Sequence, residues 1–180
     1  GVSVYSNRRD TNYGQPGTKP YVHLSNLHIH SHQEDGLRID HNYETEIKVE
    51  SLNVHDNNND GVEIYYNYDN TTVSIDSLRS VNNSRFGLYV YRPQTGTNIK
   101  VRNGDFHSNQ QNQVEVRYVE TGSHFSLRNS KIEDDTADDG YHAVYAYDCC
   151  DNNDDLSNTL DFRLNNWGST VTALMNSGTN

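Results

Sequence analysis

Residues 45–148 can be written as four successive units of 26 residues each. The units are TEIKVESLNVHDNNNDGVEIYYNYDN (45–70), TTVSIDSLRSVNNSRFGLYVYRPQTG (71–96), TNIKVRNGDFHSNQQNQVEVRYVETG (97–122) and SHFSLRNSKIEDDTADDGYHAVYAYD (123–148). Each unit opens on Thr or Ser, runs through alternating apolar residues, passes an Asn- and Asp-rich turn and ends on another alternating stretch. A fixed period of this kind predicts a solenoid in which each unit is one coil stacked on the next.

The apolar residues inside a unit are spaced for β-strands. In the unit 45–70 they form the pairs Ile47/Val49, Leu52/Val54 and Val62/Ile64. A period of two places alternate side chains on one face, whereas a helical solenoid would need a period of 3.6. We therefore expect an all-β fold: a right-handed, single-stranded parallel β-helix of about five to six coils, with three short strands per coil about 4.8 Å from their equivalents.

The same pattern of alternating apolar residues and turns continues on both sides of these units. Upstream, PYVHLSNLHIHSHQEDGLRIDHNYE (20–44) is a coil one residue shorter, and GVSVYSN (1–7) matches the strand that begins at Gly87, so it is expected to end a preceding coil. Residues 8–19 are an inserted turn, 20–147 the regular coils, 148–158 an acidic loop and 159–180 a last irregular coil, with strands expected at 160–164 and 171–174. We expect a single domain over 1–180, as a segment of a longer chain.

Composition limits the classes of partner. Only 32% of the residues are hydrophobic and the mean hydropathy is -0.94, which suits a solenoid, where each coil buries a few side chains against its neighbours. The net charge of -11 argues against a nucleic acid or an anionic membrane surface as partner. No apolar run approaches the ~18 residues that predict a membrane-spanning helix, so membrane insertion is not expected.

The unit resembles the repeats of the pectate-lyase-like superfamily of right-handed parallel β-helices. The resemblance lies in the Asn-rich turn and in the Asp-Gly step before a strand, at Asp35-Gly36, Asp60-Gly61 and Asp139-Gly140. That superfamily includes polysaccharide lyases, polygalacturonases, alginate epimerases, viral tailspikes and non-catalytic surface proteins. The resemblance implies a β-helix that is extracellular or on a cell or virion surface, and it does not choose among these activities.

Catalytic signatures of the superfamily are incomplete in this chain. Neither the Gly-His-Gly nor the Arg-x-Lys tripeptide of polygalacturonase-like enzymes is present, and the Asp-Pro-His-Glu motif of epimerase-like enzymes is absent too. Whether the chain is an enzyme therefore stays open. A polysaccharide lyase or epimerase is the activity that the resemblance implies if it is one.

The third strand of each coil should carry an outward, solvent-facing ladder. Its first outward position holds Ser3, Arg38, Glu63, Tyr89 and Glu115; its second holds Tyr5, Asp40, Tyr65, Tyr91 and Arg117; beside them lie His41, Tyr66, Arg92 and Tyr118. Aromatic rings pack on sugar C–H surfaces while charged groups bind hydroxyls or uronates. We expect polysaccharide binding by Tyr5, Arg38, Tyr65, Tyr89, Tyr91 and Arg117. Two alternatives stay open: tyrosines that only stack for stability, and contacts between copies of the chain.

If this face is catalytic, four residues are the candidates. Asp40, Glu63 and Glu115 could act as acid or base, and Arg117 could neutralise a substrate carboxylate. A charged surface without catalytic work would have the same composition.

Two places hold residues with the spacing of metal ligands, and neither is favoured as a metal site. Asp151, Asn153 and Asp155 have the spacing of a calcium loop, although Leu156 stands at the glycine position and Phe162 at the final acidic position, which favours a solvated acidic loop. The second place is the alternating series His28, His30 and His32, which could chelate a metal or simply form an exposed strand face. We expect no cofactor, and Ca²⁺ is the one candidate left open.

Two asparagines stand in glycosylation sequons. They are Asn70, in Asn70-Thr71-Thr72, and Asn82, in Asn82-Asn83-Ser84, while Asn83 itself is not in a sequon. Three functional hypotheses result: a module that recognises polysaccharide, a non-catalytic structural protein that assembles into a fibre, sheath or appendage, and a polysaccharide lyase or epimerase. The expected partners are accordingly a polysaccharide or other copies of the chain, in a homo-oligomer or filament.

Overall fold

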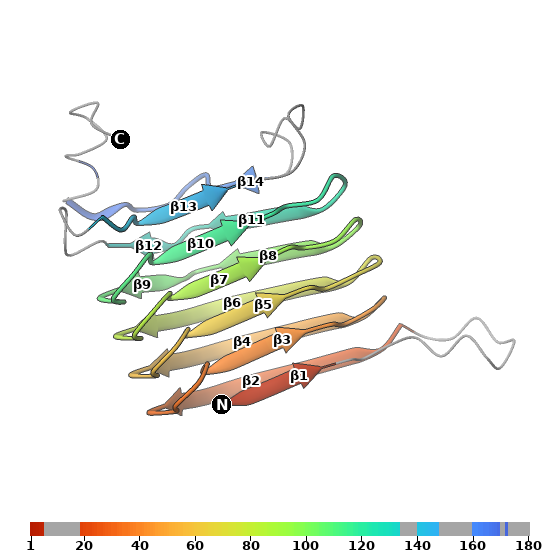
Figure 1. The fold of residues 1–180 in the computed structure, drawn as a ribbon, viewed down its shortest axis with the longest axis horizontal. Coiled ribbons are helices and arrows are strands. Elements are labelled where there is room, and N and C mark those ends of the chain that lie inside the picture. The colour runs from red at the N-terminus through yellow and green to blue at the C-terminus, as the bar shows by residue number, and fades with distance from the viewer. Residues whose placement is uncertain (6–18, 134–139, 148–159, 170–171, 173–180) are drawn as a thin grey trace, which may run out of the picture.

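The computed structural model describes residues 1–5, 19–133, 140–147, 160–169 and 172 of the chain. These residues form a parallel β-solenoid of about five turns, in which the coils stack from β1 and β2 at one end to β13 and β14 at the other (Figure 1). The all-β fold and the 26-residue spacing predicted from the repeats are thereby confirmed.

One sheet contains the last strand of every coil, and we call it the third-strand sheet. Its strands are β1 (Val2–Tyr5), β3 (Leu37–Asp40), β5 (Val62–Tyr65), β7 (Leu88–Tyr91), β10 (Val114–Arg117) and β13 (Val144–Tyr147), in that spatial order. Equivalent residues pair in parallel register, as Leu37 with Val62 and Val62 with Leu88. Val2 pairs with Leu37, so the first repeat spans 35 residues where the next spans 25.

The second sheet contains the strands that open each coil. They are β2 (Tyr21–His30), β4 (Glu46–His55), β6 (Thr72–Val81), β8 (Asn98–Arg102), β9 (Asp105–His107), β11 (His124–Arg128), β12 (Lys131–Ile132) and β14 (Leu160–Asp161). In β2, β4 and β6 the first two predicted strands are one ten-residue strand, whereas in the next two coils they remain separate. The continuous and the divided forms differ little, because a single residue makes the bend between the first and second predicted strands.

That bend is made at one position in every coil, and we call this set the bend column. Its members have positive φ, between 53° and 63°, and are Asn26, Ser51, Ser77, Asn103, Asn129 and, in the last coil, Leu164, which the register of β14 on β11 places level with Asn129. All six are exposed. Asn tolerates the left-handed conformation better than most residues, and Ser, like Asn, bonds readily to nearby backbone at turns, so the sequence suits the backbone at every position of the column except Leu164.

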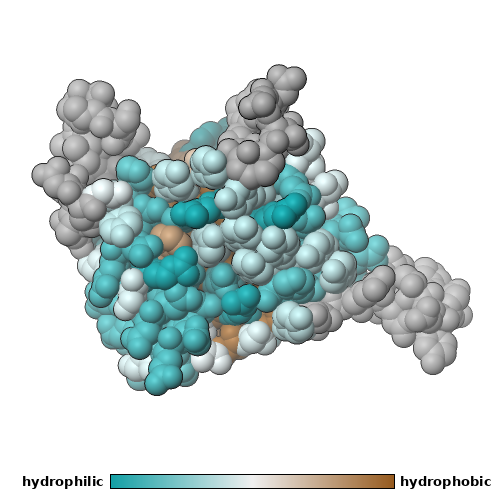
Figure 2. Space-filling view, in the orientation of Figure 1, coloured by the Kyte–Doolittle hydropathy of each residue, from teal (hydrophilic) through white to brown (hydrophobic). Residues whose placement is uncertain are grey.

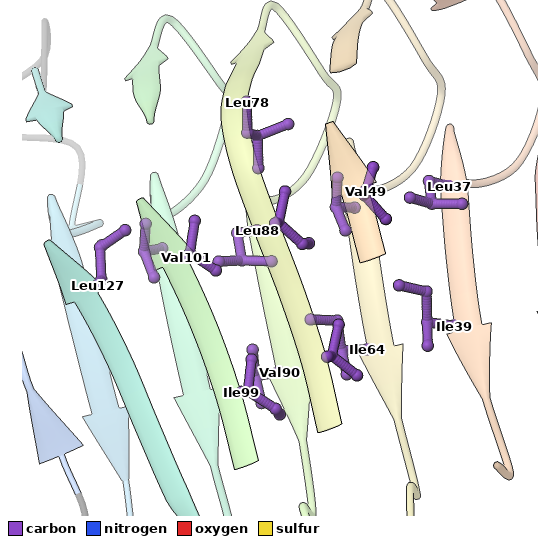
Figure 3. Close-up of a cluster of buried hydrophobic side chains, with 14 of the residues drawn as sticks. Leu37, Ile39, Val49, Ile64, Leu78, Leu88, Val90, Ile99, Val101 and Leu127 are labelled. Carbon is purple, nitrogen blue, oxygen red and sulfur yellow. The ribbon is translucent and has the colours of Figure 1, made fainter. Parts of the chain in front are cut away.

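Apolar side chains from the two sheets meet inside the coil. Figure 3 shows Leu37, Ile39, Ile64, Leu88 and Val90 of the third-strand sheet and Val49, Leu78, Ile99, Val101 and Leu127 of the second sheet. All are fully buried or nearly so, and each contributes about 1.5–3 kcal/mol by leaving water. Because every coil repeats the same small set, a chain with few apolar residues still has a continuous core.

A ladder of buried asparagines runs beside this core. Asn57 Nδ2 donates to Oδ1 of Asn83, and Asn83 Nδ2 donates to Oδ1 of Asn109, both at 2.9 Å. The backbone N–H groups of Asn57 and Asn83 donate to the same oxygens, at 3.2 and 3.0 Å. Each side chain thereby satisfies groups of two successive coils, which fixes their register.

The residues that open the repeats also point inward. Thr45, Thr71, Thr97 and Ser123 are all buried. The hydroxyl of Thr71 donates to the carbonyl of Asn42 at 3.0 Å, and that of Thr97 to the carbonyl of Asn67 at 2.9 Å. The recurring hydroxyl therefore satisfies a carbonyl of the coil before it.

The C-terminal end departs from the regular pattern. β14 pairs with β11, and Phe162 packs on Phe125 with 5.6 Å between ring centroids. The strand expected at 171–174 is wrong at Thr172, which lies in a helical turn with Gly168, the carbonyl that its hydroxyl bonds at 2.6 Å. Within the described ranges, no helix has the length and apolar character needed to cross a membrane.

Candidate functional site

The third-strand sheet forms the two outward columns expected from the repeats. Parallel pairing places Arg38 beside Glu63, Glu63 beside Tyr89 and Tyr89 beside Glu115. The second column follows in the same register: Tyr5, Asp40, Tyr65, Tyr91, Arg117 and Tyr147. The predicted neighbours are therefore correct.

The expectation that these residues all face solvent is wrong. Glu63 is 6% exposed, Tyr89 7% and Glu115 0%, and Asp40 is buried as well. Their side chains leave the coil, but the turn that precedes each strand packs over them. Asn112 Nδ2, for example, donates to Glu115 Oε2 at 2.6 Å.

Arg38 stands at the centre of a cluster of carboxyl groups from two coils. Its guanidinium nitrogens lie 2.7 Å from Glu63 Oε2, 3.0 Å from Asp40 Oδ2 and 3.7 Å from Asp35 Oδ2. Burial and the neighbouring Asp35 raise the pKa of Glu63 to about 8, against the opposing effect of Arg38. The nearby carboxyl of Asp35 thus favours the protonated form of Glu63.

Two further acid–arginine pairs lie along the same face. Asp60 Oδ2 is 3.5 Å from Arg85 Nη1, and burial raises the pKa of Asp60 to about 7 although Arg85 opposes this. Glu115 forms an ion pair with Arg117. Burial also raises the pKa of the Tyr89 phenol well above its usual range.

The four catalytic candidates therefore fall into two groups. Asp40 and Glu63 both contact Arg38, whereas Glu115 pairs with Arg117, two coils away along the stack from Glu63. Each of the three carboxylates is buried and already forms an ion pair with an arginine. In this arrangement the first role of these acids and of Arg117 is to balance charge within the face.

The tyrosines of the second column do not form one flat wall. Tyr65 and Tyr91 stack with 5.0 Å between centroids and 12° between ring planes, so each covers part of the other's face. Tyr118 stands across Tyr91 at 81° and across Tyr147 at 78°. Tyr65 and Tyr91 therefore pack on each other, while Tyr5 (61% exposed) and Tyr147 (44%) offer most of the open ring surface.

Beside these tyrosines the chain turns away from the sheet, and we call the residues at this turn the aromatic corner column. They are His41, Tyr66, Arg92 and Tyr118, with φ between 44° and 57°. Bulky side chains rarely adopt this left-handed conformation. They contact one another along the stack: the His41 and Tyr66 rings stack at 5.7 Å, and Arg92 Nη1 donates to Tyr66 Oη at 3.3 Å.

A neighbouring pair of rings was missed at the sequence level. Tyr43 and Tyr68 stack at 4.5 Å with 5° between their planes. The signal was present in the aligned repeats, because His41-Asn42-Tyr43 corresponds to Tyr66-Asn67-Tyr68. The asparagines between them point inward, and Asn42 Nδ2 donates to Asn67 Oδ1 at 2.9 Å.

The predicted histidine series is only partly brought together. His28 and His30 lie close to each other, but their further neighbour is His55 of the next coil: His28 Nε2 is 2.6 Å from His55 Nε2, and the rings of His30 and His55 stack at 5.1 Å. His32 instead uses its backbone N–H, which donates to Asn57. Over the part of the chain with assigned structure, no group of three or more His, Cys, Asp or Glu side chains is arranged to hold a metal ion.

The remaining predicted sites divide by location. Asp151, Asn153 and Asp155 lie outside the described residues. Both sequon asparagines, Asn70 and Asn82, are exposed and have positive φ in turns, and their glycosylation stays a prediction.

The space-filling view shows the third-strand face covered mostly by hydrophilic and intermediate side chains (Figure 2). This surface is amphipathic, with phenol hydroxyls and guanidinium groups among aromatic rings. No protein family, curated protein or solved structure matches this chain.

Proposed function

We propose that the third-strand face and the aromatic corner column bind a polysaccharide. The observation that carries the proposal is the occupancy of the strained corner by His41, Tyr66, Arg92 and Tyr118. A non-glycine residue in this conformation costs about 1 kcal/mol or more, and strain of this kind gathers at functional sites. The bend column has the same backbone conformation and uses Ser or Asn at five of its six positions, with Leu164 at the sixth.

The chemistry of the face suits sugars. Tyrosine combines an apolar ring with a hydroxyl that donates and accepts hydrogen bonds, which matches the C–H surfaces and hydroxyls of a pyranose. Equivalent groups recur at each coil, about 4.8 Å apart. A polymer of repeating sugar units lying along the stack would meet several of them at once, and the combined contacts would strengthen binding.

Two finer features belong to the same proposal. The Asp-Gly steps and Asn-rich turns support membership of the pectate-lyase-like superfamily, and an extracellular, cell-surface or virion-surface location agrees with a polysaccharide ligand. Tyr5 and Tyr147 lie at the two ends of the second outward column of the third-strand sheet. Their exposed rings favour a second candidate function, in which they contact other copies of the chain.

Affinity electrophoresis through gels containing different polysaccharides tests the proposal. The wild-type chain should be retarded by at least one polymer, and Tyr66→Asn and Tyr118→Asn should reduce that retardation about tenfold or more. Tyr21→Ser is the control, because Tyr21 is more exposed than either corner tyrosine but lies in the second sheet. Equal loss in the control, or no retardation by any polymer, would refute polysaccharide binding by this face.

Sedimentation of the same proteins tests the second candidate. Self-association that rises with concentration and is removed by Tyr147→Ser would support contacts between copies. A monomer at all concentrations would exclude them.

A further inference from the structure

We infer that the polysaccharide bound by this face is uncharged, a neutral hydroxyl-rich glycan rather than a uronate or sulfated polymer. The inference rests on the proposed function, because it concerns the same face. It follows from how the arginines of the face are held. An anionic ligand needs a cation that is free to turn toward it.

Each arginine that contacts the face already has an acidic partner. Arg38, which also lies over the Tyr65 ring at 5.1 Å, contacts Glu63 at 2.7 Å. Arg92, over the Tyr66 ring at 5.5 Å, has its Nε 3.1 Å from Glu120 Oε1.

The other two arginines are held in the same way. Arg85, 5.6 Å from the Tyr89 ring, has its Nη1 3.5 Å from Asp60 Oδ2. Arg117 pairs with the fully buried Glu115.

The balance of charge confirms that no positive excess remains among these groups. The four arginines are matched by six carboxyl groups: Asp35, Asp40, Asp60, Glu63, Glu115 and Glu120. The sum is 4 − 6 = −2 when all are ionised, and 4 − 4 = 0 when Asp60 and Glu63 are protonated, as their raised pKa values allow near neutral pH. His41 adds a charge only when protonated, and it is paired with Asp40.

At Arg38, Arg85 and Arg117 an anionic ligand would therefore have to draw the arginine away from a buried acid, and at Arg92 away from the partly exposed Glu120. Removing Arg117 from Glu115 would leave a charge without its counter-charge inside the protein, which is strongly unfavourable. A neutral sugar has no such requirement, because its hydroxyls can bond to phenol groups and to guanidinium N–H groups that stay paired. The same reasoning weakens the lyase hypothesis, in which Arg117 would neutralise a substrate carboxylate.

Pairs of polymers that share a sugar backbone and differ in charge test the inference. We would compare hydroxyethyl cellulose with carboxymethyl cellulose, and methyl-esterified with de-esterified polygalacturonate, by affinity electrophoresis at about pH 8, where histidine is neutral. The neutral member of at least one pair should be bound about tenfold more tightly than its charged counterpart, with little change between low and high salt.

The outcomes separate this inference from the function on which it rests. If no polymer is bound, the proposed function fails. If the charged member is bound better, whether calcium or a chelator is present, polysaccharide binding stands and the inference is overturned.

A variant with a free arginine sharpens the test. Glu120→Gln removes the charge that holds Arg92 and can still accept the bond that Gln94 Nε2 donates at 2.6 Å. It should raise the affinity for the charged polymer relative to the neutral one several-fold. Glu50→Gln is the control, since it changes the net charge equally but lies on the second sheet, paired with Lys48 and His23. An unchanged ratio in Glu120→Gln, or an equal change in both variants, would overturn the inference.

Discussion

The bend column and the aromatic corner column have the same backbone conformation and very different side chains. Both turn the chain with one left-handed residue per coil; the bend residues are exposed, whereas at the corner Arg92 is exposed and the three rings are partly exposed. At the bend five of the six residues are Ser or Asn, which suit turns, and the sixth is Leu164, whereas at the corner they are His, Tyr, Arg and Tyr. The backbone alone explains the Ser and Asn residues of the first set. The proposed binding of a polysaccharide would explain the second set.

The largest expected effect is a difference in stability between substitutions of the inward-pointing Asn83 and of its exposed neighbour Asn82. Asn83→Leu leaves the backbone N–H and the Nδ2 of Asn57 without their acceptor, so we expect a loss of about 3 kcal/mol in the free energy of unfolding. Asn82→Ser, one residue earlier and exposed with φ of 55°, should change it by less than about 0.5 kcal/mol. Urea denaturation measures both, and equal effects would contradict the assignment of inward and outward positions.

The buried acids of the third-strand face should make stability depend on pH. The pKa of folded Glu63 is about 8, above its ordinary value, so its contribution is full below about pH 4.5 and is lost as the pH rises through 8. Glu63→Gln should remove part of this dependence, with a gain over wild type of order 2 kcal/mol above pH 8. Asp60, with its pKa of about 7, should keep the remainder.

Urea denaturation of both proteins between pH 5 and pH 9 checks this. Parallel pH profiles would contradict the account of Glu63.

Replacing a corner tyrosine should separate stability from binding. Tyr66→Asn removes ring contacts but places a residue suited to positive φ at the corner, so the free energy of unfolding should stay unchanged or rise by up to about 1 kcal/mol. Polysaccharide binding should fall. Thermal or urea unfolding, measured on the sample used for electrophoresis, provides the test. A loss of more than about 2 kcal/mol would show that the corner tyrosines serve the fold.

Placing a tyrosine in the bend column should have the smallest effect. Ser77→Tyr puts a bulky side chain at an exposed bend, where it should cost about 1 kcal/mol of stability and create no binding. Ser77→Asn, which suits the same conformation, should be neutral. A stabilised Ser77→Tyr protein would mean that tyrosine is tolerated at any left-handed position of this solenoid. The contrast between the bend column and the aromatic corner column would then be lost.

The repeats predicted the fold and much of the site because both depend on local periodicity. Once Val62 and Leu88 occupy equivalent places in their repeats, parallel stacking forces Glu63 to lie beside Tyr89, and the pairing agrees. The burial of Glu63 could not be predicted in the same way. It depends on turn residues packing back over the strand, which no period of apolar residues encodes.

The missed neighbours have the same cause. His55 lies beside His28 because adjacent coils stack, and the spacing within one strand pointed to His32 instead. Aligning the repeats by coil, as for Tyr43 and Tyr68, recovers contacts of this kind. Ring orientation and exposure still required the packed structure.

Amide hydrogen exchange with and without hydroxyethyl cellulose tests the central claim most directly. The backbone N–H groups of Tyr66, Arg92 and Tyr118 each donate to a carbonyl of the next coil, at 2.8 to 3.0 Å, so their exchange can be followed. The account predicts that the polymer slows exchange around these corners and leaves the segments around Ser77 and Asn103 unchanged. Slowing at the bend column, or equal slowing over both sheets, would contradict the claim that the aromatic corner column is the binding surface.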